Sequence, residues 1–237
     1  MKKIFLLLFG ISMLGMNAQQ KKLNEGLKKE LDEIMRLDQE YRKLFDTDIT
    51  PEKKDEVLKT LHIDKEEFKK KNWMLVAQQD SVNLQKVEKI ISQYGYPGKT
   101  LVGEPTNKSV WYVIQHSTKI GKYLPLIKEA GKNKEIPFTW VAMMEDRYLM
   151  QIGQEQIYGT QGSGEFWEEN GKEYETQYIW PVKDPENVNE RRKKAGFSNT
   201  MEEYAKSLYG DGFVYRIYTL DDIKSKSKRI EAKEVKH

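Results

Sequence analysis

Regularly spaced hydrophobic residues predict helices along the first third of the chain. Leu, Ile and Tyr recur at steps of three and four over residues 21–45, and Lys, Glu and Asp occupy the positions between them. This spacing places the apolar side chains on one face, so we predict a long amphipathic helix here. Pro51 suits the first turn of a short second helix, and Asp64 with Glu67 is typical of the cap of a third helix that runs through Leu75.

The middle of the chain carries four further helix patterns. Apolar residues over 84–94 predict a helix that ends at a glycine, and residues 109–117 are apolar on nearly every side, which indicates a deeply buried helix. Residues 123–130 predict another helix, with Gly131 as its natural stop. A proline opens the last of the four, which covers 137–153.

The C-terminal third predicts a hairpin followed by two short helices. Residues 156–158 and 177–180 are aromatic and β-branched, as strands are, and a glycine-rich, acidic stretch over 162–175 lies between them. We therefore expect a hairpin with a long, mobile loop. Capping patterns then predict helices over 184–196 and 200–208.

Together these elements predict a mainly α fold with a small β-hairpin, an α+β chain built on a single helical domain. The predicted parts are a signal peptide over 1–18, N-terminal helices over 19–75, a core helical domain over 76–208 with its hairpin near 156–180, and a C-terminal part over 209–237. The C-terminal part alternates like a strand over 213–218 and ends in a basic tail that we expect to be disordered.

The first residues have the layout of a secretory signal peptide. Lys2 and Lys3 precede an apolar run over 4–16, and Ala18 offers a cleavage site before a polar stretch. A membrane span needs about 20 apolar residues, so the run is short for a span, and a retained anchor is the alternative. We therefore expect an exported protein, periplasmic or secreted, with no transmembrane segment after cleavage.

Composition removes several classes of chemistry. The 237 residues include 40 Lys and Arg against 37 Asp and Glu, three His and no Cys. The absence of cysteine excludes a thiolate nucleophile, a Cys-ligated zinc site and an iron–sulfur cluster. A net charge of +3 is too small to indicate nucleic acid as a partner. His62 and His237 lack companion ligands in the sequence, so we predict neither a metal site nor a cofactor.

His116 is the first catalytic candidate, because it is the one histidine in an apolar context. An imidazole near its ordinary pKa is the usual proton-transfer group, and the alternative is a buried, hydrogen-bonded structural histidine. Asp146 and Arg147 are the companion candidates, since they interrupt an otherwise apolar helix and cannot face the same direction. Arginine matches phosphate and carboxylate ligands, and a structural ion pair is the alternative here.

Polar residues on otherwise apolar or strand-like segments supply the candidate ligand-binding set. These residues are Gln115, Gln156, Tyr158, Thr160, Gln161 and Arg191. The glycine between Tyr158 and Thr160 permits close approach of the backbone to a ligand or to another element. Arg191 and Arg192 are a candidate phosphate grip, but paired arginines on a capped surface helix are more often solvated.

Six short segments stand in order along the chain. They are YGYPG at 94–98, QH at 115–116, LPLIKEA at 124–130, EDR at 145–147, QxYGTQ at 156–161 and DPENVxERR at 184–192. Together they resemble a bacterial family known only as a domain of unknown function, over about residues 27–208. The resemblance implies that the helical body, the hairpin and the arginine-bearing helix form one domain. It implies no activity, substrate or cofactor.

Two hypotheses for function follow. In the first, a pocket around His116 and Arg147 binds a small polar or anionic ligand, with hydrolysis as an extension in which His116 moves the proton. In the second, the protein is a non-catalytic extracytoplasmic interaction module whose polar residues form an internal network. A cluster of His116, Arg147, Tyr158 and Gln161 around an open cavity favours the first hypothesis, and mutual satisfaction of these residues favours the second.

Overall fold

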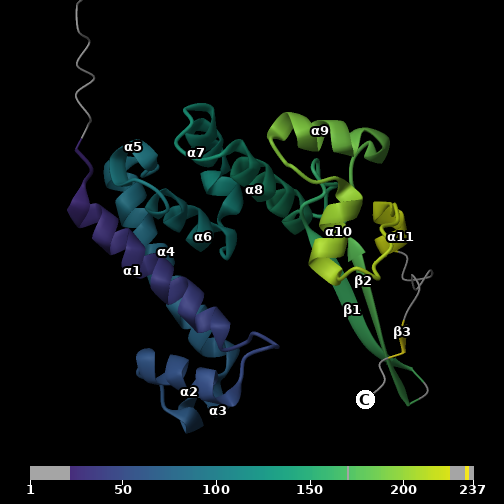
Figure 1. The fold of residues 1–237 in the computed structure, drawn as a ribbon, viewed down its shortest axis with the longest axis horizontal. Helices are drawn as coiled ribbons and strands as arrows, with labels where there is room; N and C mark the ends of the chain where they lie inside the picture. The colour runs from purple at the N-terminus through teal and green to yellow at the C-terminus, as the bar shows by residue number, and fades with distance from the viewer. Residues whose placement is uncertain (1–21, 170, 225–232, 235–237) are drawn as a thin grey trace, which may run out of the picture.

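The computed structural model describes residues 22–169, 171–224 and 233–234 of the chain. Helices dominate it, and the β-structure is a hairpin joined by a short third strand (Figure 1), so the predicted mainly α fold with a small hairpin is confirmed. The helices are α1 (Glu25–Lys43), α2 (Pro51–Thr60), α3 (Lys65–Lys71), α4 (Trp73–Tyr94), α5 (Lys99–Val102), α6 (Ser109–Gln115), α7 (Ile120–Lys132), α8 (Phe138–Gln151), α9 (Val188–Ala195), α10 (Met201–Tyr209) and α11 (Leu220–Lys224). The strands are β1 (Gly162–Glu169), β2 (Lys172–Ile179) and β3 (Lys233–Glu234).

Helices α1, α4 and α6 pack together and contribute to the main core. Asn24 caps α1, and its side chain accepts a hydrogen bond from the backbone N–H of Leu27 at 3.0 Å. The apolar face of α1, which includes Leu31 and Ile34, is buried against α4 and α6. Burial of each such side chain contributes about 1.5–3 kcal/mol, so these contacts hold α1 and α4 side by side, as Figure 1 shows.

A smaller core lies at the C-terminal end of α1, where α2 and α3 pack. Pro51 and Asp64 occupy the first turn of α2 and the cap of α3, as predicted. The predicted extension of the third helix through Leu75 is wrong, because α3 ends and Asn72 adopts a φ of 46°. This positive φ breaks the helical path, so α4 starts afresh at Trp73 and runs unbroken to Tyr94.

Helix α6 is buried on nearly every side, as predicted, and α7 and α8 pack against each other beside it. The prediction that Gly131 stops its helix is wrong, because α7 continues to Lys132. A Cβ atom at Gly131 would lie 2.4 Å from Cγ2 of Val141 on α8. The glycine therefore permits close packing of two helices instead of ending one.

The hairpin occupies the segment over 162–175 that predicts a mobile loop, so that prediction is wrong. β1 and β2 pair in antiparallel register along their whole length, and β3 pairs with β2. The register pairs Glu169 at the end of β1 with Lys172 at the start of β2. Residues 156–158 form no strand, and a bridge joins Gln156 to Val182.

The last helices follow their predicted positions. Thr200 and Glu203 form the expected capping box at the start of α10, and α9 precedes it. Residues 213–218 are irregular instead of forming the predicted strand, and they include Phe213 and Tyr215, which pack against the apolar core that joins β2 to α10. Side-chain packing, and not strand pairing, holds this segment.

Within the described residues, no helix is both long and apolar enough to cross a membrane. The predicted signal peptide over 1–18 lies outside the described residues, and so does most of the predicted basic tail. In Figure 1 the α1–α4 pair and the hairpin extend in the same direction from the α7–α8 pair, which lies between them.

Candidate functional site

Asp146 is the centre of a hydrogen-bond network that fixes the segment after α8. Its side chain is fully buried, and its carboxylate accepts hydrogen bonds from the backbone N–H groups of Ile157 (2.7 Å), Tyr158 (3.0 Å) and Thr160 (3.0 Å). The Thr160 hydroxyl donates a further hydrogen bond at 2.9 Å. Burial raises the pKa of Asp146, and these donors oppose the rise because they favour the ionised form. The carboxylate thus takes the place of a strand partner for this backbone.

Two glutamines close the same loop. Gln156 is fully buried, and its Oε1 accepts from the backbone N–H of Gln161 at 2.8 Å. Its Nε2 donates to the carbonyls of Gln161 (2.9 Å) and Trp180 (2.6 Å). Gln161 Nε2 donates to the carbonyl and the hydroxyl of Thr160, both at 3.0 Å. These candidate ligand-binding side chains are therefore bonded inside the protein.

Arg192 is buried in the same network, so the expectation of a solvated arginine is wrong. Its guanidinium donates to the carbonyls of Tyr158 (2.9 Å) and Asn199 (3.1 Å). The rings of Phe197 and Tyr204 lie 4.7 Å and 4.9 Å from its central carbon. Burial lowers the pKa of Arg192, but the carbonyls and ring faces stabilise its charge.

Arg191 and Tyr204 hold the loop from α9 and α10. Arg191 Nε donates to the carbonyl of Ile157 at 3.0 Å, and its terminal nitrogens donate to residues 183–184. The Tyr204 hydroxyl donates to the carbonyl of Thr160 at 2.9 Å. We call this network the loop clamp, which comprises Asp146, Gln156, Tyr158, Thr160, Gln161, Arg191 and Arg192.

Arg147 follows Asp146 on α8 but stays outside the loop clamp. It makes no hydrogen bond or ion pair with any residue that the structure describes, and Asp146 makes no ion pair there either, so the alternative of a structural ion pair is not realised. Burial lowers the pKa of Arg147. Its positive charge helps to lower the pKa of His116 and opposes the rise that burial causes in the pKa of Tyr204, so Arg147 lies within electrostatic reach of each.

His116 follows the last residue of α6 and approaches α1. Its Nε2 lies 3.3 Å from the amide nitrogen of Gln115 and 3.8 Å from the carboxylate of Asp38. An amide N–H only donates, so Nε2 accepts and the ring proton is on Nδ1. Burial and the charges of Arg42 and Arg147 lower the pKa of His116 to about 3. Asp38 is beyond hydrogen-bond distance, and its carboxylate does not offset that decrease.

Asp38, Arg42 and Asp80 connect α1 to α4 beside His116. Arg42 donates to both carboxylate oxygens of Asp80 (3.0 and 2.9 Å) and to the backbone carbonyl of Asp38 (2.7 Å). The Asp38 side chain is fully buried, and its Oδ1 has no hydrogen-bond partner in the described residues. Burial raises the pKa of Asp38 to about 6, although the charge of Arg42 and a hydrogen bond from Gln39 oppose this.

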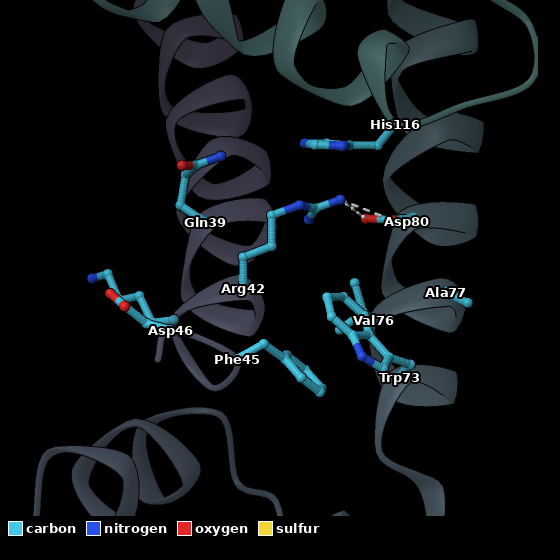
Figure 2. Close-up of a pocket in the computed structure, with 10 residues that line it drawn as sticks. Gln39, Arg42, Phe45, Asp46, Trp73, Val76, Ala77, Asp80 and His116 are labelled. Atoms are coloured by element: carbon cyan, nitrogen blue, oxygen red, sulfur yellow. Dashed lines mark hydrogen bonds and ion pairs between the residues drawn. The ribbon is translucent and has the colours of Figure 1, made fainter. Parts of the chain in front are cut away.

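Arg42, Asp80 and His116 border an open pocket of about 830 Å³ between α1, α4 and the end of α6 (Figure 2). The polar lining residues are Gln39, Arg42, Lys43, Asp46, Asp80 and His116, and the apolar ones are Phe45, Trp73, Val76 and Ala77. Figure 2 shows Arg42, Asp80 and His116 converging between the two helices, with the aromatic side chains at the other end. We call this cavity the α1–α4 pocket.

An aromatic pair forms the apolar end of the α1–α4 pocket. The rings of Phe45 and Trp73 are stacked, with centroids 3.8 Å apart and an interplanar angle of 19°. Trp73 nevertheless exposes 58% of its surface. Its stacking position fixes the indole, and its exposure leaves aromatic surface available at the pocket.

A family of unknown function, DUF6624, matches residues 64–217, which is more than half of the chain. The chain belongs to the DUF6624 family. No curated protein and no solved structure matches it. The predicted resemblance to a family of unknown function is thus confirmed at that level, although the match begins at residue 64 and not at residue 27.

The DUF6624 match includes the whole loop clamp but only part of the α1–α4 pocket. Trp73, Asp80 and His116 lie within the matched residues, whereas Gln39 and Arg42 precede them. The pocket is therefore composite, because α1 supplies one wall and the DUF6624 region supplies the other. Contacts between α1 and α4, and between α1 and α6, hold the two parts together.

The structure divides the candidate residues predicted from the sequence into two separate groups. His116 and Arg147 are not in the same hydrogen-bonded cluster as Tyr158 and Gln161. The sequence did not identify Asp38 as a candidate, because charged residues on an amphipathic helix are usually exposed. A signal for it exists, because Asp38 continues the apolar face of α1 four residues after Ile34. A carboxylate on an apolar face must be buried, paired or functional.

Proposed function

We propose that this DUF6624 protein binds a small, uncharged polar ligand in the α1–α4 pocket. The observation that supports this proposal is the convergence of Arg42, Asp80 and His116 at one end of an open cavity of about 830 Å³. Binding sites of small molecules are concave, largely apolar and equipped with a few convergent polar groups. The buried carboxylate of Asp38 lies 3.8 Å from His116, and its Oδ1 has an ion pair with Arg42 at 3.3 Å but no hydrogen bond within the described residues.

The charge balance of the α1–α4 pocket favours a neutral ligand over the anionic one expected from sequence. Arg42 and Lys43 carry positive charges, and Asp46 and Asp80 carry negative ones. His116 is uncharged at neutral pH because its pKa is lowered to about 3. Arg42 is also bonded to Asp80 through both carboxylate oxygens, so its charge is already compensated.

The low pKa of His116 favours a ligand-binding role over a hydrolytic one. A general base works best when its pKa lies near the operating pH, and an imidazole with a pKa of about 3 is a weak base at neutral pH. As a neutral ring with Nε2 bonded to Gln115, His116 presents the N–H donor of Nδ1 to a ligand. We therefore assign His116 a hydrogen-bonding role, and its burial together with the charges of Arg42 and Arg147 keeps the ring neutral.

The second hypothesis, an internal structural network, describes the loop clamp best. Asp146, Gln156, Thr160 and Gln161 bond to one another or to the loop backbone. Fully satisfied buried networks fix a conformation, and they leave few groups free for a ligand. We further propose that the protein acts outside the cytoplasm, periplasmic or secreted, because residues 1–18 have the layout of a signal peptide.

A thermal-shift screen tests the proposed function. The purified protein and its His116→Gln variant are heated with neutral saccharides, nucleosides and amino-acid amides, and with charged relatives of each. Because a ligand that binds only the folded state raises the Tm, we expect a neutral compound to raise it in the wild type and much less in the variant. An equal increase in both proteins would contradict the proposed site.

A further inference from the structure

We infer that the ligand of the α1–α4 pocket is a neutral oligosaccharide, one sugar ring of which lies against Trp73. This inference rests on the proposed function and names its ligand class. It depends on three features of the pocket, namely an aromatic platform, a set of planar polar side chains and a balanced charge.

The aromatic platform is rigid and exposed. Phe45 stacks on Trp73 at 3.8 Å, so the indole is held in place before any ligand arrives. Trp73 still exposes 58% of its surface although it lines the cavity. A sugar ring has an apolar face of C–H groups, and an aromatic ring offers that face a flat surface of matching size.

The polar groups opposite the platform suit hydroxyl groups. A hydroxyl both donates and accepts, so it pairs with mixed donors and acceptors and not with one kind alone. Arg42 and His116 supply N–H donors, Asp46 and Asp80 supply carboxylate acceptors, and Gln39 supplies both kinds. The Oε1 atom of Gln39 has no partner among the described residues, since its Nε2 alone is bonded, to Asp38.

The volume and the charge of the α1–α4 pocket further restrict the class of ligand. A cavity of about 830 Å³ falls in the range of about 300–1,000 Å³ that holds drug-sized ligands, which suits more than one sugar ring. The positive charges of Arg42 and Lys43 are balanced by the negative charges of Asp46 and Asp80, so the cavity has no net charge to attract a uronic acid. A neutral sugar needs no such attraction, so the absence of net charge does not weaken its binding.

The test is an NMR titration of the ¹⁵N-labelled full protein with cellotriose, tri-N-acetylchitotriose and maltotriose. Trigalacturonic acid and adenosine serve as charged and non-carbohydrate probes. We expect at least one neutral trisaccharide to shift the indole N–H signal of Trp73 and the backbone signal of His116. The charged trisaccharide is expected to bind at least tenfold more weakly.

Variants of Trp73 decide whether the platform matters. We expect Trp73→Ala to weaken trisaccharide binding about tenfold, since stacking on an aromatic ring contributes about 1.4 kcal/mol. Trp73→Phe keeps a ring and should stay close to the wild type, even if the alanine variant folds poorly. Met74→Ala is the matched control, because Met74 is the next residue, is 61% exposed and does not line the pocket.

Each outcome of the titration separates the two proposals. Neutral trisaccharide binding that is lost in Trp73→Ala and kept in Met74→Ala supports the inference. Binding of adenosine but of no trisaccharide, with dependence on His116, overturns the carbohydrate inference and leaves the proposed function intact. If none of these probes shifts Trp73 or His116, the carbohydrate inference is overturned, and the wider thermal-shift screen decides the proposed function separately.

Discussion

Asp146 and Asp38 are both fully buried carboxylates with an arginine nearby, but their hydrogen bonding differs. Asp146 accepts hydrogen bonds from three backbone N–H groups and a hydroxyl. Asp38 accepts one from Gln39, and its second oxygen has no such partner among the described residues. The first carboxylate is a structural anchor inside a closed loop, and the second lies behind an open pocket.

Hydrogen bonding, and not residue type, distinguishes the structural carboxylate from the one beside the pocket. Buried polar groups in folded proteins are nearly always bonded, so an unbonded one requires an explanation. The loop clamp needs no ligand to complete it, because its side chains bond to the loop that they hold. The Asp38–His116 region leaves polar capacity unused beside a cavity.

The largest expected effect comes from removing the anchor of the loop clamp. Asp146→Ala leaves three buried backbone N–H groups without their acceptor, so we expect the free energy of unfolding to fall by about 3–5 kcal/mol. Urea denaturation measures this change. Asp211→Ala, on an exposed position, is the control and should change stability by less than about 0.5 kcal/mol. A loss below about 1 kcal/mol for Asp146→Ala would remove the distinction between the two carboxylates.

The next effect is a pH dependence of opposite sign in two variants of the pocket region. Asp38 has a folded pKa of about 6 against an ordinary value of 3.8, so it stabilises the fold at low pH and this contribution is lost as the pH rises through 6. His116 has a folded pKa of about 3 against 6.5, so its contribution is complete above pH 6.5 and is lost as the pH falls towards 3. Between pH 4 and 6 the two slopes cancel in the wild type.

Single substitutions break this cancellation. In His116→Gln only Asp38 remains, so the free energy of unfolding should fall by up to about 1.4 kcal/mol per pH unit, relative to the wild type, as the pH rises from 4 to 6. In Asp38→Asn the relative slope should have the opposite sign. Chemical denaturation at pH 4, 5 and 6 measures both. Parallel curves for the two variants would show that neither group is perturbed by burial.

A smaller effect is expected when one hydrogen bond of the loop clamp is removed. Thr160→Val keeps the shape of the side chain but loses the hydroxyl that donates to Asp146 and accepts from Gln161. The expected loss of stability is about 1–2 kcal/mol. Thr160→Ser retains the hydroxyl and should lose less. The ranking is reversed if the network contributes nothing and only the methyl group matters.

The smallest effect on stability is expected at the rim of the pocket. Asp80→Asn weakens the ion pair with Arg42, whose side chain is partly exposed, so we expect a loss of about 1 kcal/mol or less. Ligand binding should suffer much more, because Arg42 then loses the partner that positions it. Calorimetric titration beside urea denaturation separates the two effects. A large loss of stability with unchanged affinity would place Arg42 and Asp80 among the structural groups.

Local patterns predicted most helices, because caps and apolar periodicity act within a few residues. The capping box of Thr200 and Glu203 and the first-turn position of Pro51 are examples. The predicted first strand is absent because the Asp146 carboxylate, on the preceding helix α8, accepts hydrogen bonds from the backbone of Ile157 and Tyr158 and overrides their strand character. No local pattern contains that contact.

The candidate site was only partly predictable for the same reason. His116 is recognisable from its apolar surroundings, and the structure places it in the α1–α4 pocket. Its neighbour Asp38 and the pocket residue Asp80 come from helices far away in sequence, where they look like ordinary charged surface. Arg192 was misjudged because its burial depends on Phe197 and Tyr204, which lie on a later turn and a later helix.

The central claim is that the α1–α4 pocket binds a ligand while the loop clamp supports the fold. Its most direct test is calorimetric titration of His116→Gln and Thr160→Val, at pH 7 and a temperature where both are folded, with the compound that most raises the wild-type Tm. We expect affinity at least tenfold weaker in His116→Gln and unchanged in Thr160→Val. Weaker binding in Thr160→Val with wild-type affinity in His116→Gln would contradict it.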